Sequence, residues 1–228
     1  MHIVFLSGEY PLWTSGGVGT FIQTFGRSLV QAGHRVSVVG PGKDKQELKM
    51  EDEGVQIYRL PKNNGFLPNF VFNAIQINRK LKQLQKELPI TIIEAAEGGL
   101  ALLAKAHEAK KVIRLHGGHH FFSEAEKRKI NWRKGWLEKR SFSKADGFIA
   151  ISQYVKDHTA NYLTYGNRPI TIISLPLDTS KQTPQVEAQK DHILFAGTVC
   201  EKKGVRQLIE AFKIVREKYP SKVLDIYG

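Results

Sequence analysis

The sequence has one cysteine and lacks a long hydrophobic run, and each shortage excludes a class of protein. Because Cys200 is the single cysteine among 228 residues, an internal disulfide framework is excluded and a reducing cytosol is favoured. No apolar run approaches the ~20 residues of a membrane span, and no signal peptide precedes the first apolar segment. We therefore expect a cytoplasmic protein that contacts a membrane, if at all, peripherally at its inner face.

Two common nucleotide-binding signatures are also missing. The glycine-rich segment 16–20 (GGVGT) is not followed by the Gly-Lys-Ser/Thr of the phosphate loop of NTPases. The predicted strand 35–39 runs into Gly40-Pro41-Gly42 without the carboxylate that would hold the ribose of NAD. An NTPase with a phosphate loop and an NAD-dependent dehydrogenase are therefore both disfavoured.

Acidic residues are scarce relative to basic ones. The chain has 34 Lys and Arg against 22 Asp and Glu, and its formal net charge is +12, which indicates a polyanionic partner. Basic side chains gather in two predicted helical segments, 79–86 and 127–140, and the second also carries Trp132 and Trp136. We favour an anionic membrane surface or acceptor over nucleic acid, since no nucleic-acid-binding module frames these segments. For the segment 79–86, a solvated helix face is the commoner meaning of such charges.

The glycine-rich segment lies between a predicted strand, 2–6, and a predicted helix with an apolar stripe from Val18 to Val30. Glycines at such a junction leave backbone N–H groups bare at a helix N-terminus, where a phosphate or sugar can approach. The candidate binding residues here are Gly16, Gly17, Gly19 and Thr20. A tight turn that only serves the fold is the alternative interpretation.

Strands and helices alternate along the chain, which predicts an α/β fold with a doubly wound parallel sheet. The expected strands are 2–6, 35–39, 55–60, 91–93, 112–115, 148–151 and 170–173. We expect a surface excursion over 43–53, a long helix opened by Pro68 and a helix through 102–103. Glu97, His116 and Ser152 each follow a strand, so they are expected at the carboxyl edge of the sheet with the glycines. Ser152 is also a predicted helix N-cap.

The composition changes after this sheet. Residues 1–173 are predicted to form the Rossmann-like domain, and the Pro-, Ser-, Thr- and Gln-rich stretch 174–190 is predicted to be a linker. Residues 191–228 contain one further strand–helix–strand unit, which cannot cover both faces of its own sheet. We therefore expect 191–228 to be the beginning of a second, incomplete α/β domain.

Taken in order, several short motifs resemble those of the family 4 retaining glycosyltransferases, which have the two-domain GT-B architecture. The matching segments are SGEYP (7–11), GGVGT (16–20), AGHRVSV (32–38), LHG (115–117), ADGFIAIS (145–152), ILFAG (193–197), EKKG (201–204) and LIEAF (208–212). Each motif is weak alone, but their order and spacing are specific and cover nearly the whole chain.

The resemblance implies transfer of a sugar from a nucleotide-sugar donor to a glycan or lipid-linked acceptor, with retained configuration and without a metal or other cofactor. His116 would contact the donor sugar as the catalytic residue, and the glycine segment would lie beside the donor phosphate and the acceptor. Lys203 would bind the donor diphosphate and stabilise the leaving group. The sequence has no Asp-x-Asp motif, which agrees with a metal-independent reaction.

Three departures from the family pattern qualify this expectation. Thr198 stands where the family usually has a phosphate-binding arginine, and LPLD (175–178) replaces the usual Asn-Gly-Val-Asp. The family's carboxylate pair that holds the donor sugar and ribose would lie beyond Gly228. We therefore expect the 228 residues to be inactive by themselves.

Alternatives remain for single features. His116, His119 and His120 could bind zinc, although no fourth ligand has a convincing spacing. Glu94 and Glu97 could form an acid/base pair, although Glu97 is better interpreted as an acceptor contact. For the chain as a whole, the alternative to a transferase is a non-catalytic module that binds a polyanion or a membrane.

Overall fold

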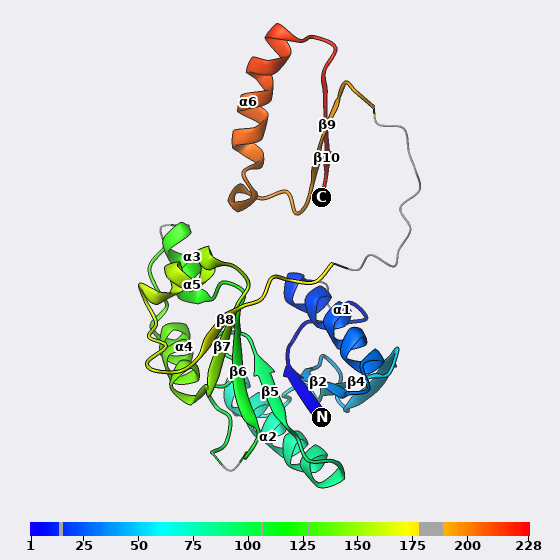
Figure 1. The fold of residues 1–228 in the computed structure, drawn as a ribbon, viewed down its shortest axis with the longest axis vertical. Helices are drawn as coiled ribbons and strands as arrows, with labels where there is room; N and C mark the ends of the chain where they lie inside the picture. Colours follow the sequence, from blue (N-terminus) through cyan, green and yellow to red (C-terminus); the bar gives the residue numbers. More distant parts are fainter. Residues whose placement is uncertain (14–15, 106, 127, 178–188) are drawn as a thin grey trace. The chain divides into compact units, whose positions relative to one another are not determined.

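The computed structural model describes residues 1–13, 16–105, 107–126, 128–177 and 189–228, which belong to two compact units, Met1–Asp178 and Thr179–Gly228 (Figure 1). The strands of the first unit are β1 (His2–Leu6), β2 (Arg35–Pro41), β3 (Leu48–Asp52), β4 (Val55–Leu60), β5 (Ile92–Ala95), β6 (Lys110–Leu115), β7 (Gly147–Ala150) and β8 (Ile170–Ile172). Its helices are α1 (Gly17–Gln31), α2 (Asn69–Glu87), α3 (His119–Ala125), α4 (Trp132–Lys144) and α5 (Gln153–Ala160).

The first unit is organised around one eight-stranded sheet in the order β3-β4-β2-β1-β5-β6-β7-β8. Every pairing is parallel except that of β3 with β4. The order runs outward in both directions from β1, so crossovers lead to both sides of the first strand. This is the doubly wound, Rossmann-like α/β fold that the alternation of strands and helices predicts.

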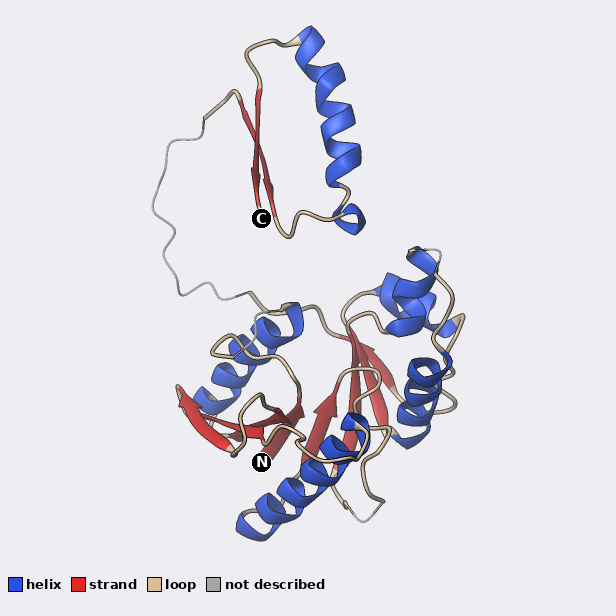
Figure 2. Cartoon of the chain, turned by 180° about the vertical axis from the view of Figure 1, so that it is seen from behind, coloured by secondary structure: helices blue, strands red, loops and turns tan. Residues whose placement is uncertain are grey.

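Helices lie on both faces of the sheet (Figure 2), and the buried apolar side chains form two clusters. All five residues of β1 are buried, and the four apolar ones alternate between the clusters because successive side chains of a strand point to opposite faces. Ile3 and Phe5 pack in the cluster that contains Phe21 and Ile22 of α1. Val4 and Leu6 belong to the larger cluster, to which the helices contribute Leu81 and Leu84 of α2, Phe142 of α4 and Val155 of α5.

Three local predictions for the first unit were wrong. The expected excursion 43–53 contains β3, an antiparallel edge strand joined to β4 by a tight turn in which Glu53 and Gly54 have φ of 47° and 85°. The expected helix through 102–103 is absent from the described residues 96–105, which form turns closed by bonds such as Gly99 N to Ala96 O (2.8 Å). Gly98 and Gly99 disfavour a helix there because glycine loses the most backbone freedom in one.

The third difference concerns the basic helical segment 127–140. Its helix, α4, begins at Trp132, where Asn131 is the N-cap and accepts bonds from the backbone N–H groups of Arg133 and Lys134. Lys127 lies outside the described residues. A separate short helix, α3, covers His119 and His120. The two helices are therefore distinct elements, and both contribute to the site described below.

The second unit comprises β9 (His192–Ala196), the 3₁₀ turn η1 (Glu201–Lys203), α6 (Val205–Lys218) and β10 (Val223–Tyr227). β9 and β10 pair in parallel, and most of their residues are exposed or half-buried. Of the predicted linker 174–190, residues 178–188 lie outside the described part of the chain. The assignment of 1–173 to an acceptor-side domain and of 191–228 to a donor-binding domain stays a prediction.

Gly40 of β2 offers a test of the packing at the carboxyl edge of the sheet. A Cβ at this position would overlap the carbonyl oxygen of Ser7 and lie 2.8 Å from Nη1 of the buried Arg59. Because both neighbours are fixed in a dense core, we expect Gly40→Ala to lower the free energy of unfolding by about 3 kcal/mol. Urea denaturation measures this, with Gly65→Ala as the control, where the nearest atom to a new Cβ is 3.7 Å away. Equal stability of the two variants would refute the close packing.

Candidate functional site

Four strand ends place the candidate residues at one edge of the sheet. β1, β5, β6 and β7 are consecutive and parallel, so their carboxyl ends lie side by side (Figure 1). The chain continues from these ends into the glycine segment, Glu97, His116 and Ser152 respectively. The sequence-predicted residues of the first unit are therefore brought to the edge where ligands bind in open α/β sheets.

The glycine segment forms the start of α1, and two of its glycines, Gly16 and Gly19, are packed too closely for a side chain. Gly16 is the N-cap, and its carbonyl accepts from Thr20 through both the backbone N–H (3.0 Å) and Oγ1 (3.1 Å). A Cβ at Gly19 would lie 2.9 Å from the backbone nitrogen of Tyr10, and one at Gly16 would overlap Oε2 of Glu9. Thr14 and Ser15, just before the segment, lie outside the described residues.

The side-chain carboxylate of Glu9 lies at the N-terminus of α1, a contact that the sequence analysis did not predict. Its Oε2 accepts a bond from the backbone N–H of Gly19 at 3.3 Å, so a carboxylate stands where the exposed amides and the helix dipole favour an anion. Ser7 holds the backbone of this residue, donating Oγ–H to the Glu9 carbonyl and accepting from the Glu9 N–H, each at 3.0 Å. The position is therefore already used by an anionic group of the chain itself.

Tyr10 anchors the loop that leads into α1. It is fully buried, and its hydroxyl donates to Oδ2 of Asp52 at 2.7 Å. The same carboxylate accepts from Arg27 of α1 through Nη2 (2.5 Å) and Nε (3.1 Å). Loop, helix and edge strand β3 are thereby tied together, which fixes the glycine segment against the sheet.

His116 lies directly after β6 and packs against α1. Its ring centroid is 5.3 Å from that of Phe21, and His116 and Val18 line the same small cavity beside the first turn of α1. Burial, reinforced by the nearby Arg114 cation, lowers the pKa of His116 to about 4. The imidazole is therefore neutral at physiological pH and can exchange hydrogen bonds with a polar ligand without adding charge.

A buried ion pair lies next to this histidine. Arg114 and Glu94, from adjacent strands, are 2.6 Å apart from Nε to Oε1, and both side chains are almost inaccessible. The guanidinium also lies over the ring of Phe21, 4.5 Å from its centroid. Such a pair is costly to bury but fixes the groups it touches. Glu94 is thus committed to Arg114, which disfavours the acid/base pair of Glu94 and Glu97.

Glu97 holds the loop that carries His116. Its Oε1 accepts from the backbone N–H groups of His116 and Gly117, each at 2.7 Å, and the residue is 4% exposed. Burial, together with repulsion from Glu138, raises the pKa of Glu97 to about 7. Gly117 has φ of 94°, a conformation that favours glycine. The proposed acceptor contact of Glu97 stays untested, and its present bonds give it a positioning role.

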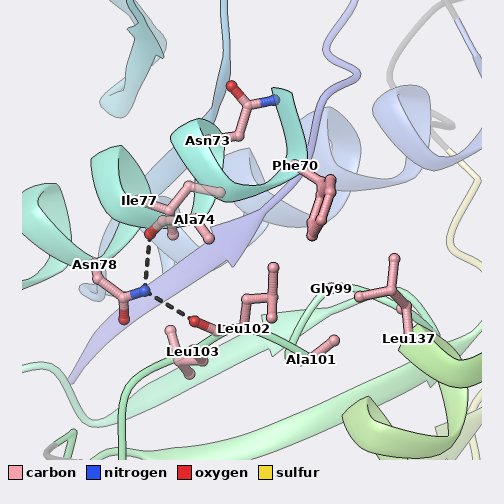
Figure 3. Close-up of a pocket in the computed structure, with 11 residues that line it drawn as sticks. Phe70, Asn73, Ala74, Ile77, Asn78, Gly99, Ala101, Leu102, Leu103 and Leu137 are labelled. Carbon is pink, nitrogen blue, oxygen red and sulfur yellow. Dashed lines mark hydrogen bonds between the residues drawn. The ribbon is translucent and has the colours of Figure 1, made fainter. Parts of the chain in front are cut away.

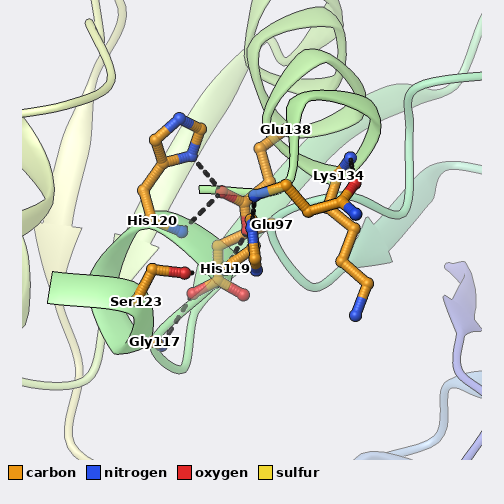
Figure 4. A network of polar contacts seen from close by, with 8 residues as sticks. Glu97, Gly117, His119, His120, Ser123, Lys134 and Glu138 are labelled. Atoms are coloured by element: carbon orange, nitrogen blue, oxygen red, sulfur yellow. Dashed lines mark hydrogen bonds and ion pairs between the residues drawn. The ribbon is translucent and has the colours of Figure 1, made fainter. Parts of the chain in front are cut away.

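Glu138 of α4 supports the next residues of the same loop (Figure 4). Its Oε1 accepts from the backbone N–H of His119, and its Oε2 accepts from the N–H of His120 (3.1 Å) and contacts Nδ1 of that residue (2.5 Å). Sequence reasoning missed this residue. The available signal was that Glu138 is the single carboxylate in the otherwise basic helix 132–144.

These contacts bear on the zinc hypothesis. His120 faces Glu138, while Nε2 of His119 accepts from the backbone N–H of Asn131 at 2.8 Å. Within the described ranges, no group of three or more His, Cys, Asp or Glu residues could hold a metal ion. His119 and His120 therefore stabilise the local structure, and His116 lines the small cavity beside α1. The three histidines form no metal centre within the described residues, and metal independence stays a prediction.

The remaining predicted residues are Ser152 and Lys203. Ser152 is the N-cap of α5, as expected, and its Oγ accepts from the N–H of Val155 at 3.2 Å. Its proposed ligand contact stays a prediction. Lys203 is exposed at the end of η1, next to Gly204, whose φ is 75°. Lys203 belongs to the second unit, and its proposed contact with the donor diphosphate stays a prediction.

No helix among the described residues is long and apolar enough to cross a membrane.

Comparisons with known proteins agree with the fold and the motifs. Residues 15–181 match the family model described as Glycosyltransferase Family 4. Glycogen synthase of Mycobacterium tuberculosis is 24% identical over 258 residues, an alignment that covers 100% of this chain and 61% of that protein. The chain thus spans about three fifths of the length of the curated relatives it matches.

Two solved structures share the architecture. Sucrose-phosphate synthase from Thermosynechococcus elongatus superposes with a TM-score of 0.76 at 14% identity, covering 100% of this chain and 62% of that one. A glycosyltransferase from Rickettsia africae ESF-5 gives a TM-score of 0.63 at 14% identity, covering 100% of this chain and 68% of that one. At these identities the likeness concerns the fold alone.

Proposed function

The chain belongs to glycosyltransferase family 4, and on this premise we propose that it supplies the acceptor-side part of an enzyme that uses a nucleotide-sugar donor. The sugar is transferred to a glycan or lipid-linked acceptor with retained configuration and without a metal ion. The enzyme works in the cytoplasm, and its basic surface allows peripheral contact with an anionic membrane. The name of the mycobacterial relative, glycogen synthase, supports a sugar-transfer reaction of this general kind.

One observation carries the proposal: the first turn of α1 and the loop after β6 meet at the carboxyl edge of the sheet. Val18 and His116 line one small cavity there, and Phe21 packs against the imidazole. The backbone amides at the start of α1 favour the donor phosphate, while His116 stands beside them for the sugar. A donor that spans this junction would have both its charged and its neutral polar parts recognised.

The chemistry assigned to each residue follows from its surroundings. His116 is neutral, so it binds a sugar hydroxyl and orients the reacting carbon rather than delivering a proton. Glu97 and Glu138 hold its loop through backbone N–H groups. The donor phosphate has to displace or rearrange the Glu9 carboxylate, which now accepts from Gly19. Lys203 supplies positive charge for the departing diphosphate.

The proposal is tested by comparing the 228-residue chain with a version extended by a complete donor-binding domain. We expect the short chain to bind a nucleotide-sugar weakly and to transfer nothing, because its second unit is one strand–helix–strand unit with a lysine-bearing turn, whereas tight binding needs a largely enclosed pocket with several placed polar groups. The extended chain is expected to bind and to transfer. Calorimetry and product analysis, including the anomeric configuration and a run with chelator, measure each part separately.

In the extended enzyme, His116→Ala should lower kcat/KM by roughly 10- to 100-fold, the loss of one good hydrogen bond to the reacting sugar. The matched control is His34→Ala, at a half-buried position before β2. Robust transfer by the short chain, or equal activity of the His116 and His34 variants, would show that the active site is misplaced.

A further inference from the structure

An apolar pocket opens between α2, the turns after β5 and α4, away from the residues used above (Figure 3). Its volume is about 170 Å³, and its walls include Phe70, Ala74 and Ile77 of α2, Leu102 of the turns and Leu137 of α4. Since a water molecule takes up about 30 Å³, the pocket has room for roughly five or six water-sized or methylene-sized groups. It is therefore large enough for a short length of hydrocarbon chain.

The polar side chain of Asn78, which lines this pocket, already has hydrogen-bond partners within the protein. Asn78 donates to the carbonyls of Ala74 (2.8 Å) and Leu102 (2.9 Å), and its Oδ1 accepts from the backbone N–H of Ala104 (2.7 Å). A ligand consequently gains little by hydrogen bonding at this position, and the remaining walls are mostly apolar. The pocket favours an apolar group over a sugar.

Two guanidinium groups lie at the rim. Arg133 of α4 is 5.8 Å from the ring centroid of Phe70, a wall residue contributed by α2. Arg140 donates from Nε to the carbonyl of Ala101, another wall residue, at 2.9 Å. α4 as a whole carries five cationic side chains and one carboxylate, the buried Glu138. A ligand with an apolar part inside the pocket and a negative charge outside it would match this arrangement.

The surface around the pocket also exposes large aromatic side chains. Trp132 is 76% exposed, Trp136 is 48% exposed and Phe70 is 39% exposed, and Phe66, shortly before α2, is fully exposed. Arg140 lies over the ring of Trp136 at 5.3 Å. Aromatic rings interspersed with arginines are characteristic of surfaces that rest in the headgroup region of a bilayer. A merely solvated helix face would not need these aromatic residues.

We propose that this surface, defined by Phe66, Phe70, Trp132, Arg133, Trp136 and Arg140, docks on an anionic lipid bilayer and that its pocket takes a short length of one hydrocarbon chain of a lipid. The aromatic residues enter the headgroup region, and the arginines meet lipid phosphates. The docking itself needs no sugar transfer. Its consequence for the acceptor, that a lipid-linked acceptor is used rather than a soluble glycan, rests on the proposed function.

The pocket adjoins the loop that carries His116, which gives the docking a functional meaning. Gly98, in the pocket wall, directly follows Glu97, whose carboxylate binds the amides of His116 and Gly117. Leu137, in the opposite wall, directly precedes Glu138, which supports His119 and His120. The pocket and the loop that carries His116 are therefore supported by the same two segments of the chain, 97–98 and 137–138.

The first experiment measures co-sedimentation of the 228-residue chain with vesicles of phosphatidylcholine, alone or mixed with phosphatidylglycerol. We expect binding to the anionic vesicles that falls steeply at high salt, and little binding to neutral ones. The double variant Arg133→Gln with Arg140→Gln should bind anionic vesicles roughly 20-fold more weakly, because each cation near an anionic surface contributes a similar factor to the affinity. The matched control, Lys49→Gln with Lys110→Gln, removes two exposed charges elsewhere on the same unit and should have little effect.

The second experiment tests the pocket by calorimetry with inorganic phosphate and a series of alkyl phosphates below their micelle concentrations. Affinity should rise roughly fourfold for each added methylene and level off at about six carbons, when the pocket is full. Ala74→Leu, which adds volume inside the pocket, should move this plateau to a shorter chain. Thermal unfolding and vesicle binding of the same variant report whether it is folded.

Each result decides the proposal without a transfer assay, so failure here leaves the proposed sugar transfer standing and removes only the membrane contact. Equal binding to neutral and anionic vesicles, or unchanged binding by the double arginine variant, would overturn bilayer docking. An affinity that does not depend on chain length would overturn the pocket assignment. A dimer that dissociates in the arginine variant, without vesicle binding, would identify a second copy of the chain as the occupant and reject the lipid.

Discussion

Glu138→Ala is expected to lower the free energy of unfolding by about 4 kcal/mol, because a buried carboxylate that is bonded to several N–H groups is removed. The side chain is 6% exposed and contacts His120 Nδ1 at 2.5 Å, and it accepts from two backbone N–H groups. Alanine would leave the buried His120 ring and both amides without this partner, and each unsatisfied buried group has its own cost. Urea denaturation measures the loss.

The control for this prediction is Glu108→Ala. Glu108 is exposed, so its removal should change the stability by less than about 0.5 kcal/mol. A comparable, small effect of both substitutions would mean that Glu138 does not support the loop.

The same variant should also loosen the candidate site locally. Hydrogen exchange of the backbone amides from His116 to His120 should become faster in Glu138→Ala, because two of these amides lose their acceptor. Amides of β9, in the second unit, serve as an internal reference and should be unchanged. Glu138→Gln keeps an acceptor oxygen and is expected to retain most of the protection. Uniform acceleration in both units would indicate global destabilisation instead of a local support.

Much of the architecture could be predicted because short-range patterns determine it. The strands 2–6 and 55–60 agree with β1 and β4, and the strand–helix–strand unit expected in 191–228 agrees with β9, α6 and β10, because their apolar and β-branched residues lie between clear turn signals. The N-cap role of Ser152 was confirmed for a similar reason, since a serine before a helix is a local signal. The grouping of strand ends at one edge follows from parallel topology alone.

The supports of the site could not be predicted because they depend on contacts between distant residues. α3 begins after Gly118, where the side chain of Glu138 from α4 accepts two backbone bonds that no local pattern announces. The hydrogen bond between the Glu9 carboxylate and the first turn of α1 likewise depends on how the preceding loop folds back. Residues 96–105 form turns in place of the expected helix. The apolar stretch there is short, and the backbone freedom that two glycines would lose in a helix costs more than such a stretch gains.

The last prediction concerns Glu97 and the dependence of stability on pH. Burial, followed by repulsion from Glu138, raises the pKa of Glu97 to about 7 from an ordinary value of 4.5. Between these two values the folded state binds more protons than the unfolded state, so this carboxyl makes the fold less stable as pH rises. The full difference corresponds to a loss on the order of 3 kcal/mol between pH 4.5 and pH 7.

Glu97→Gln should remove this dependence, because the amide does not titrate while its carbonyl oxygen can still accept from His116 and Gly117. His116 acts in the opposite direction: burial lowers its pKa to about 4, so its contribution to stability rises with pH between about 4 and 6.5. The wild-type curve alone therefore mixes two opposing slopes. The decisive quantity is the difference in unfolding free energy between Glu97→Gln and the wild type, measured by urea denaturation from pH 5 to pH 8. This difference should shift in favour of the variant as pH rises, and a difference independent of pH would show that Glu97 titrates as an ordinary exposed carboxyl does.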